Sequence, residues 1–391
     1  MTVSSARDRL RIAVAGLGAI ARTAHLPLLE RRRDLFEVTA LCDLSPGALA
    51  EVGARYGVPV KDRHTSTEAL LAQGGFDAVL LLTSGSHGPA AQAALRAGYA
   101  VLCEKPLAFT RAEAGRIAEA ERAQQRGPRL MVGYMKQYDP AARRLAALLG
   151  EAGGAGRVRS AEVCVLHPTG GDQLSFARLP APYDDLDAEA LAVLKEQDAA
   201  LTDAALGSGA TEATRSLYHV VLGSISHDLS LLRMVTGAPT SVELAETWGA
   251  SAAGPGSVEL SGGLPGGARY TIRWHFLPSH ASYRETFALH HETGSLQLAF
   301  PSPYLMNAPT VLTETAAGAG EGPHAERRAE YRSVTEAFEE ELVAFHTMVT
   351  DGTPPRTGVA GAAEDLLTAQ RAVAAYTARH QLPCEGEAAS A

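Results

Sequence analysis

The chain has 391 residues, a formal net charge of −9 and a hydrophobic fraction of 46%. That length is enough for about two or three domains with sizeable cores. The negative charge argues against nucleic acid as a partner, because phosphate binding needs a basic surface. No apolar run reaches membrane-spanning length, so we expect no membrane partner either.

The four cysteines are scattered along the sequence, without a C-x-x-C pair, and predict neither a zinc site nor a disulfide framework. They are Cys42, Cys103, Cys164 and Cys384. Reduced thiols suit the cytoplasm, and residues 1–8 lack the apolar core of a secretory signal, so we expect a cytoplasmic protein without a metal. We expect the tail, residues 381–391, to be disordered after Pro383.

A glycine-rich turn follows the first predicted strand, residues 10–14, and precedes a helix-forming run. The turn has the pattern G-x-G-x-x-A beginning at Gly16. Gly16 permits the tight turn, and Gly18 lets backbone amides approach a pyrophosphate. The helix that begins around Ala19 and Ile20 offers N–H groups to the phosphates. This arrangement predicts a dinucleotide site, although an ordinary βα turn can carry the same pattern.

The second predicted strand, residues 36–42, ends directly before Asp43. An acid at this place can bind the ribose hydroxyls of the adenosine half, and it would repel a 2′-phosphate. Leu44 and Ser45 follow, with no arginine to accept that phosphate. We therefore expect NAD as the cofactor in preference to NADP.

Strands and helices continue to alternate as far as residue 134, which predicts a doubly wound parallel sheet. The further strands are predicted over 77–83, 99–103 and 130–134, and the helices over 46–56, 67–71, 90–97 and 110–125. Ligands of such sheets bind at the carboxyl ends of the strands. Thr83, Glu104, Lys105 and Lys136 all lie at such ends.

Lys105 stands between a strand and Pro106, a position that favours an extended backbone. Its ammonium would then project over the edge of the sheet, where it could bind a substrate oxygen and shuttle a proton. The same sequence pattern is also expected of a lysine at the end of a strand whose side chain simply extends into water.

The first 140 residues resemble the Gfo/Idh/MocA family, named after glucose–fructose oxidoreductase and inositol dehydrogenase. The resemblance rests on the glycine turn, Asp43, the turn Thr83–His87, the E-K-P run at Glu104 and the G-Y-M-K run at Gly133. It implies a cofactor site in which the glycine turn and Asp43 are joined by Thr83, Ser84, His87, Glu104 and Lys105.

The family architecture implies a Rossmann domain, residues 1–136, and an α/β domain, residues 137–380, with a large open, mainly antiparallel sheet. The sequence agrees independently, with strands predicted over 157–167, 241–248, 257–260, 268–276, 283–291 and 295–300. Helices are predicted over 336–348 and 360–380, the second packing back near the first domain. Family members commonly cover such a sheet with a second subunit, so we expect a homo-oligomer, a dimer or tetramer.

Two features depart from the family. Residues 169–218 form an unusually long connection, with a helix predicted over 186–206, which is either a lid or specificity segment or a plain surface excursion. The catalytic helix is also altered, because the family has Asp-x-x-x-His where this chain has Gly223 and His227. Candidates to take over the role of the missing aspartate are His167, Tyr218, His219 and Asp228.

The resemblance implies that His227 accepts a proton from a substrate hydroxyl, with Lys105 beside it. Lys136 stands where relatives have a basic residue, and we expect it to bind substrate together with Tyr138, His167 and Asp228. Ordinary packing in a helix, or at the start of one, is the alternative for these side chains.

The predicted function is that of an NAD-dependent dehydrogenase or ketoreductase acting on a CH–OH group. We expect a polyhydroxylated substrate: a sugar, a sugar nucleotide, a glycoside or a cyclitol. One alternative is a dinucleotide-binding regulator without turnover, which the missing aspartate favours. Another is a redox-neutral enzyme that uses tightly held NAD to cleave glycosidic bonds.

Overall fold

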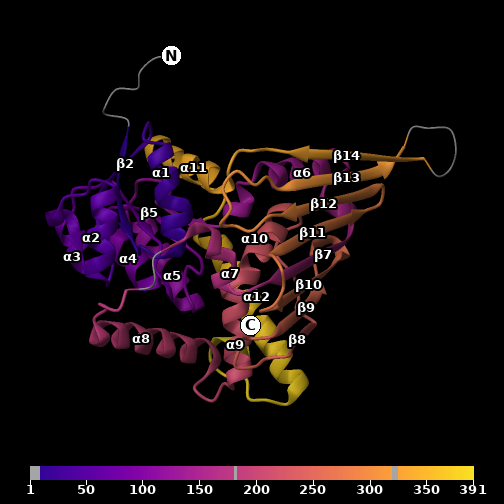
Figure 1. Cartoon of the computed structure of the whole chain (residues 1–391). Helices are drawn as coiled ribbons and strands as arrows, with labels where there is room; N and C mark the ends of the chain where they lie inside the picture. The colour runs from indigo at the N-terminus through magenta and orange to yellow at the C-terminus, as the bar shows by residue number, and fades with distance from the viewer. Residues whose placement is uncertain (1–8, 180–182, 319–324) are drawn as a thin grey trace. The chain divides into compact units, whose positions relative to one another are not determined.

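A computed structural model describes residues 9–179, 183–318 and 325–391. Residues 1–8, in which no secretory signal was expected, lie outside the described residues. The chain forms two compact units (Figure 1). The first comprises the chain up to Gly133 with residues 177–202 and 341–362, and the second comprises residues 134–176, 203–340 and 363–391.

The first unit is built on a parallel sheet in the order β3-β2-β1-β4-β5-β6. Its strands are β1 (Leu10–Ala15), β2 (Phe36–Cys42), β3 (Arg63–His64), β4 (Ala78–Leu81), β5 (Ala100–Glu104) and β6 (Leu130–Gly133). All residues of β4, β5 and β6 are buried, as expected of parallel strands covered on both faces. The predicted doubly wound sheet is confirmed.

The helices of this unit include α1 (Leu26–Arg31), α2 (Pro46–Arg55), α3 (Thr67–Gln73), α4 (Gly88–Arg96), α5 (Arg111–Ala123) and α11 (Ala337–Asp351). Helices α2, α3 and α5 begin at side chains that accept from their first amides, those of Ser45, Ser66 and Thr110. The Ser45 hydroxyl accepts a hydrogen bond from the Ala48 amide at the start of α2. Thr110 and Glu113 form a reciprocal capping box at the start of α5.

The second unit contains a sheet in the order β14-β13-β12-β11-β7-β10-β9-β8. Its strands are β7 (Val158–His167), β8 (Leu244–Trp248), β9 (Ser257–Gly263), β10 (Arg269–Phe276), β11 (Arg284–His291), β12 (Gly294–Phe300), β13 (Val311–Ala317) and β14 (Glu326–Arg332). Only the β7–β10 pair among these strands is parallel. The predicted, mainly antiparallel sheet is therefore confirmed.

Strands β13 and β14 were not predicted from the sequence. Every residue of β14 is exposed, and its sequence is mostly charged, so it has no buried face that alternation could reveal. Its backbone pairs only with β13, as an edge strand.

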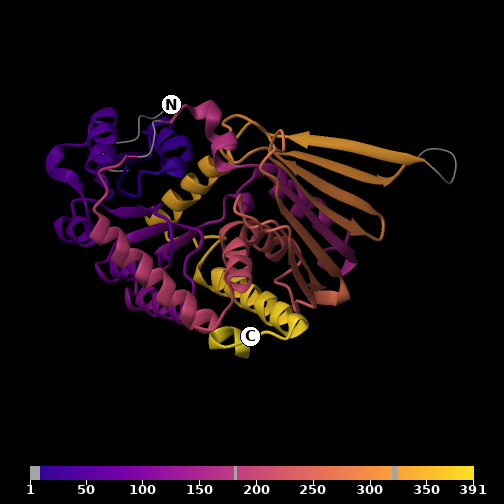
Figure 2. The same cartoon turned by 60° about the horizontal axis from the view of Figure 1, so that its bottom comes forward.

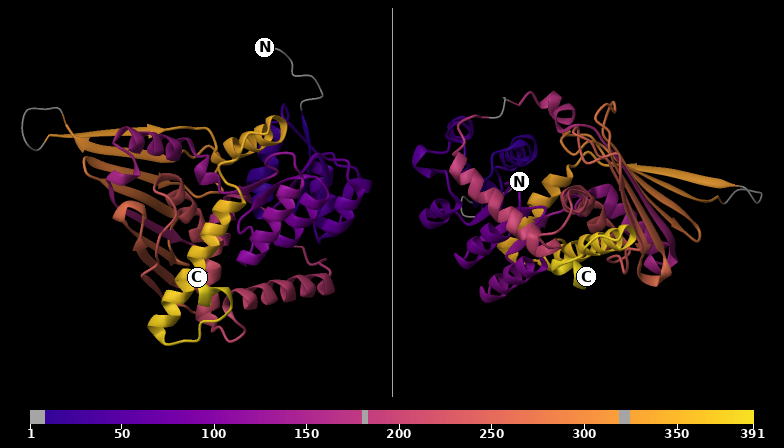
Figure 3. Two further views of the ribbon diagram at one scale, coloured as in Figure 1. Left: turned by 180° about the vertical axis from the view of Figure 1, so that it is seen from behind. Right: turned by 90° about the horizontal axis from the view of Figure 1, so that it is seen from below.

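Helices of the second unit include α6 (Pro140–Glu151), α7 (Gly170–Leu174), α9 (Glu212–Val220) and α10 (Ser226–Val235). Helix α6 begins at Pro140 with Asp139 as its cap and packs against β12, β13 and β14 (Figure 3). Helix α12 (Val359–His380) runs from the first unit into the second. No described helix is both long enough and apolar enough to cross a membrane.

The expectation of a disordered tail was wrong. Residues Gly386–Ser390 form a 3₁₀ turn, and the side chain of Ala388 is buried. The amide nitrogen Nε2 of Gln370 donates to the Glu387 carboxylate at 2.7 Å. The buried Ala388 side chain and the Gln370–Glu387 hydrogen bond help to attach a segment whose composition is typical of loose termini.

Candidate active site

The glycine turn after β1 is shaped by two glycines with different surroundings. Gly16 has φ = +94°, and a Cβ there would lie 2.6 Å from the backbone of Leu82 and Thr83. Gly18 is exposed, and a Cβ there would meet nothing within 4 Å. Gly16 therefore closes the turn against the end of β4, whereas Gly18 leaves open space above the backbone.

The helix after this turn is wound as a π-turn over Ala21–His25 before α1 begins. Pro27 has no N–H to donate to the carbonyl of Thr23, which explains the irregular turn. His25 is buried there, and its Nε2 donates to the Glu104 carboxylate at 3.0 Å.

Asp43 connects the glycine turn with the start of α2. Its Oδ2 accepts from the Leu17 amide at 2.7 Å, and its Oδ1 accepts from the Ser45 amide at 2.9 Å. Each carboxylate oxygen keeps a further lone pair for a hydroxyl donor. The open space at Gly18 and this carboxylate fit the pyrophosphate and the adenosine ribose of a dinucleotide.

The turn between β4 and α4 exposes Thr83 and Ser84 and buries His87. The two ring nitrogens of His87 lie 2.8 Å from the Pro106 carbonyl oxygen and 2.9 Å from the Thr83 carbonyl oxygen. Burial lowers the pKa of His87, which favours the neutral ring, and a neutral ring can donate to only one of the two carbonyls. His87 therefore joins this turn to the segment after Lys105 from within the fold.

Glu104 and Lys105 end β5 at the same edge of the sheet. Burial raises the pKa of the Glu104 carboxyl, but the hydrogen bond from His25 and the charge of Lys105 outweigh it, and the pKa lies below its ordinary value. The Lys105 amide donates to the Glu104 carboxylate at 3.2 Å. Glu104 is thus a buried anion that fixes the backbone of Lys105, whose side chain is half-buried.

In the second unit, Lys136 and Asp228 lie against each other and against Glu285. The Lys136 ammonium donates to Asp228 Oδ1 at 2.9 Å and also to Glu285 Oε1. Burial alone would lower the pKa of Lys136, but the two carboxylates raise it. Burial and the Glu285 charge raise the pKa of Asp228 well above its ordinary value, whereas Lys136 and a hydrogen bond from Asp228 lower that of Glu285. The cluster therefore holds one ammonium between two buried carboxyl groups.

Tyr283 connects this cluster to His167. The Tyr283 hydroxyl donates to Glu285 Oε2 at 2.6 Å, and its ring lies 5.8 Å from that of His167. His167 also lies 5.5 Å from the Trp274 ring, and its Nδ1 is 2.7 Å from the Pro168 carbonyl oxygen. Three expected substrate residues, Lys136, Asp228 and His167, therefore share one network. Tyr138, the fourth, is buried in the same unit.

His227 lies at the start of α10, directly after a π-turn over Val221–Ile225 that contains Gly223. Its ring meets that of Tyr134 edge-on, with the centroids 6.3 Å apart. The Arg233 guanidinium lies 5.7 Å from the centre of the Tyr134 ring and donates to Asp365 at 2.7 Å.

Sequence reasoning missed Tyr134, Glu285 and Tyr283. Glu285 had a detectable signal, because it shares the inward face of β11 with Phe287 and Leu289. A charged residue at such a position needs a buried partner. Tyr134 had no comparable signal, because its neighbours come from α10 and α12, far away in the sequence.

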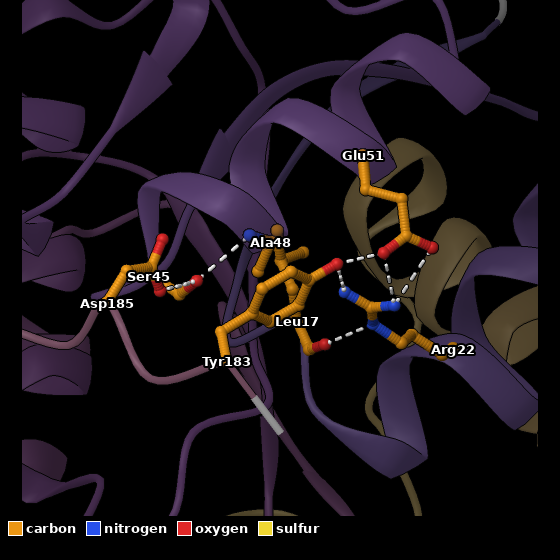
Figure 4. A network of polar contacts seen from close by, with 7 residues as sticks. All are labelled: Leu17, Arg22, Ser45, Ala48, Glu51, Tyr183 and Asp185. Atoms are coloured by element: carbon orange, nitrogen blue, oxygen red, sulfur yellow. Dashed lines mark hydrogen bonds and ion pairs between the residues drawn. The ribbon is translucent and has the colours of Figure 1, made fainter. Parts of the chain in front are cut away.

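Part of the 169–218 connection lies against two turns of the first unit, those after β2 and β4 (Figures 2 and 4). Asp185 accepts from the Ser45 hydroxyl and the Gly47 amide, both at 2.6 Å. Asp198, in α8 (Ala188–Leu206), accepts from the Ser86 amide at 3.0 Å. The connection thus contacts the turn after β2 and the turn after β4. In the described parts of the chain, no group of three metal-ligating side chains could hold an ion.

Residues 10–134 match the model of an oxidoreductase family with an NAD-binding Rossmann fold, GFO_IDH_MocA. Over 142 residues the chain is 39% identical to inositol 2-dehydrogenase of Acidiphilium cryptum, a match that covers 36% of this chain and 41% of that one. It is 35% identical over 162 residues to inositol 2-dehydrogenase 3 of Saccharopolyspora erythraea, covering 41% of this chain and 46% of that one. The chain thus matches less than half the length of these curated relatives.

Solved structures resemble the chain over nearly its whole length. An aldose-aldose oxidoreductase from Caulobacter crescentus, complexed with glycerol, has a TM-score of 0.69 at 20% identity, covering 95% of this chain and 98% of that one. At that identity the similarity establishes the fold alone.

Proposed function

We propose, from the match of residues 10–134 to the Gfo/Idh/MocA oxidoreductase model, that the protein is an NAD-dependent dehydrogenase or ketoreductase. The proposed substrate is polyhydroxylated, a sugar derivative or a cyclitol, reacting at a secondary CH–OH or keto group. The observation that carries the proposal is the position of Lys105. It follows β5 at the edge of the sheet that also holds the glycine turn and Asp43.

The residues proposed to hold the dinucleotide all lie in the first unit. The backbone around Gly18 would bind the pyrophosphate, and Asp43 the adenosine ribose. When bound, the nicotinamide supplies the acceptor or donor of a hydride. NAD is preferred in this proposal because the residues after β2 supply a carboxylate and no arginine.

Lys105 is proposed to bind the reacting oxygen of the substrate, and His227 to exchange a proton with it. An ammonium stabilises negative charge that develops on that oxygen, and a histidine can take up and return a proton near neutral pH. The buried Lys136–Asp228–Glu285 cluster would position α10, which carries His227.

The proposal is tested by following nicotinamide absorbance with NAD and a panel of cyclitols, sugars and sugar nucleotides. We expect turnover in the unmodified protein and its loss in Lys105→Met. If Lys105 and His227 serve one proton transfer, Lys105→Met combined with His227→Ala costs little more than either single change. NAD binding without turnover on any substrate would contradict the proposal and favour a regulator.

The open sheet of the second unit is the proposed surface for a second copy of the chain. Alternate residues of its strands point away from the core, among them Glu162, Arg273 and Gln297, which are all exposed. We expect a dimer or tetramer by light scattering, and a monomeric mass at micromolar concentration would contradict this expectation.

A further inference from the structure

We propose that Asp185, in the long connection between β7 and α9, is a specificity-determining residue that excludes the 2′-phosphate of NADP. This inference rests on the proposed function and deepens it. In this proposal the connection helps to discriminate NAD from NADP, a selection that would otherwise depend on the turn after β2 alone. Asp185 and its partners Ser45 and Gly47 all lie within the first unit.

Asp185 holds the groups that would otherwise be available to an anion beside Asp43. Its Oδ1 accepts from the Ser45 hydroxyl and its Oδ2 from the Gly47 amide, both at 2.6 Å (Figure 4). Ser45 and Gly47 form the N-terminal turn of α2, a helix of 10 residues. The start of a helix favours a negative charge through its free N–H groups and its dipole. The Asp185 carboxylate therefore occupies an anion position.

The place where Asp185 binds, the start of α2, matters because Asp43 lies just before it in the sequence. Asp43 precedes Ser45 by two residues and holds the Ser45 amide with Oδ1. An acid at the end of β2 binds the ribose 2′-hydroxyl in dinucleotide-binding folds. A phosphate on that hydroxyl would need donors next to Asp43, and the Ser45 hydroxyl and the Gly47 amide are two donors at this turn. With Asp185 in place, the phosphate would meet two carboxylates, and both of these donors would already be bound.

Gly47 permits this close approach. A Cβ at Gly47 would lie 2.7 Å from a ring carbon of Tyr183 and 2.9 Å from Oδ2 of Asp185. The connection therefore packs directly on the backbone of the helix start. Tyr183 and Asp185 both pack against Gly47, so the two side chains hold the connection at the same point of α2.

The positive charge in this network is already neutralised. Arg22 donates to both Glu51 oxygens at 3.2 Å and to the Leu17 carbonyl oxygen at 2.8 Å. The Tyr183 hydroxyl donates to Glu51, and Arg22 lies 5.5 Å from the centre of the Tyr183 ring. Tyr183 thus strengthens the pairing that keeps Arg22 from a phosphate.

The test measures binding of NAD and NADP to the full-length protein by calorimetry, without any turnover. We expect the unmodified protein to prefer NAD. Asp185→Asn and Asp185→Ala should narrow the ratio of the two affinities by about tenfold or more, chiefly by tighter NADP binding. Asp184→Asn is the matched control, because it removes the same charge from the neighbouring exposed residue; we expect it to change the ratio by less than about twofold.

The outcomes separate this inference from the proposed function. An unchanged ratio in both Asp185 variants would overturn the specificity role and leave the dehydrogenase intact. An equal change in Asp184→Asn would also overturn it, since general charge repulsion would then be the cause. Failure of the unmodified protein to bind NAD would overturn the proposed function, and this inference with it.

Discussion

The Nζ atom of Lys136 lies 2.9 Å from Oδ1 of Asp228, and both side chains are almost completely excluded from water. Glu285 binds the same ammonium, so a single cation serves two buried carboxyl groups. Removing the cation would leave these groups without their main source of stabilisation, and a buried charge without a partner is costly.

Replacing Lys136 by methionine should therefore lower the free energy of unfolding by about 3–5 kcal/mol. Urea denaturation measures this loss. The matched control is Arg143→Met, because Arg143 pairs with Glu340 at 3.0 Å in an exposed ion pair. Such pairs contribute about 1 kcal/mol or less. Equal losses in the two variants would show that the buried cluster does not stabilise the fold in this way.

Asp365 should make stability depend on pH between about 4 and about 6. Burial raises its pKa from 3.8 to about 6, despite the opposing charge of Arg233. In that window the folded protein binds more protons than the unfolded chain, so stability falls as the pH rises through it. The difference amounts to about 3 kcal/mol.

Asp365→Asn tests this pH dependence of stability, because the asparagine amide cannot titrate. Unfolding free energies at several pH values should show a shallower decline in the variant than in the unmodified protein, and identical slopes would contradict the pKa assigned to Asp365.

The two glycines of the first turn should respond differently to alanine. Gly16→Ala forces a Cβ against the backbone of Leu82 at a positive φ, so we expect a loss of about 1–3 kcal/mol in stability. Gly18→Ala meets open space in the fold, so its melting temperature should stay unchanged while its NAD affinity falls. Equal NAD affinity in Gly18→Ala and the unmodified protein would argue against close approach of a pyrophosphate at this residue.

His227→Ala should lower turnover by about 10²- to 10⁴-fold, since it removes the proposed proton acceptor. NAD affinity, measured by calorimetry, should stay within about twofold because His227 is not among the proposed cofactor residues. Near-normal turnover would show that another group takes the proton.

Gly47→Ala should loosen the connection from the start of α2. The added Cβ would collide with Tyr183 and Asp185, while every charge in the region is kept. We expect faster trypsin cleavage after Arg178, an exposed residue just before the contact. The rate of cleavage after the exposed Arg126 serves as an internal reference, and a parallel rise there would point to general loosening of the fold.

The local sequence was sufficient for most of the first unit. Strand β2 begins and ends at the predicted residues, and α2, α3 and α5 begin within a residue of their predicted first residues. Short-range signals determine such elements: a buried parallel strand is continuously apolar, and a helix begins at a side chain that can accept from its first amides. The edge strand β14 had neither kind of signal.

By itself, the sequence determined the glycine turn, the acid after β2 and the resemblance of the first 140 residues to an oxidoreductase family, because these depend on residues close together along the chain. Only the tertiary structure decided which distant side chains meet. Glu285 joins Lys136 across 149 positions, and Asp185 reaches Ser45 across 140. Burial makes the first pairing necessary, since an ammonium removed from water needs carboxylates beside it. The second depends on where a long connection returns to the sheet, which spacing along the chain does not encode.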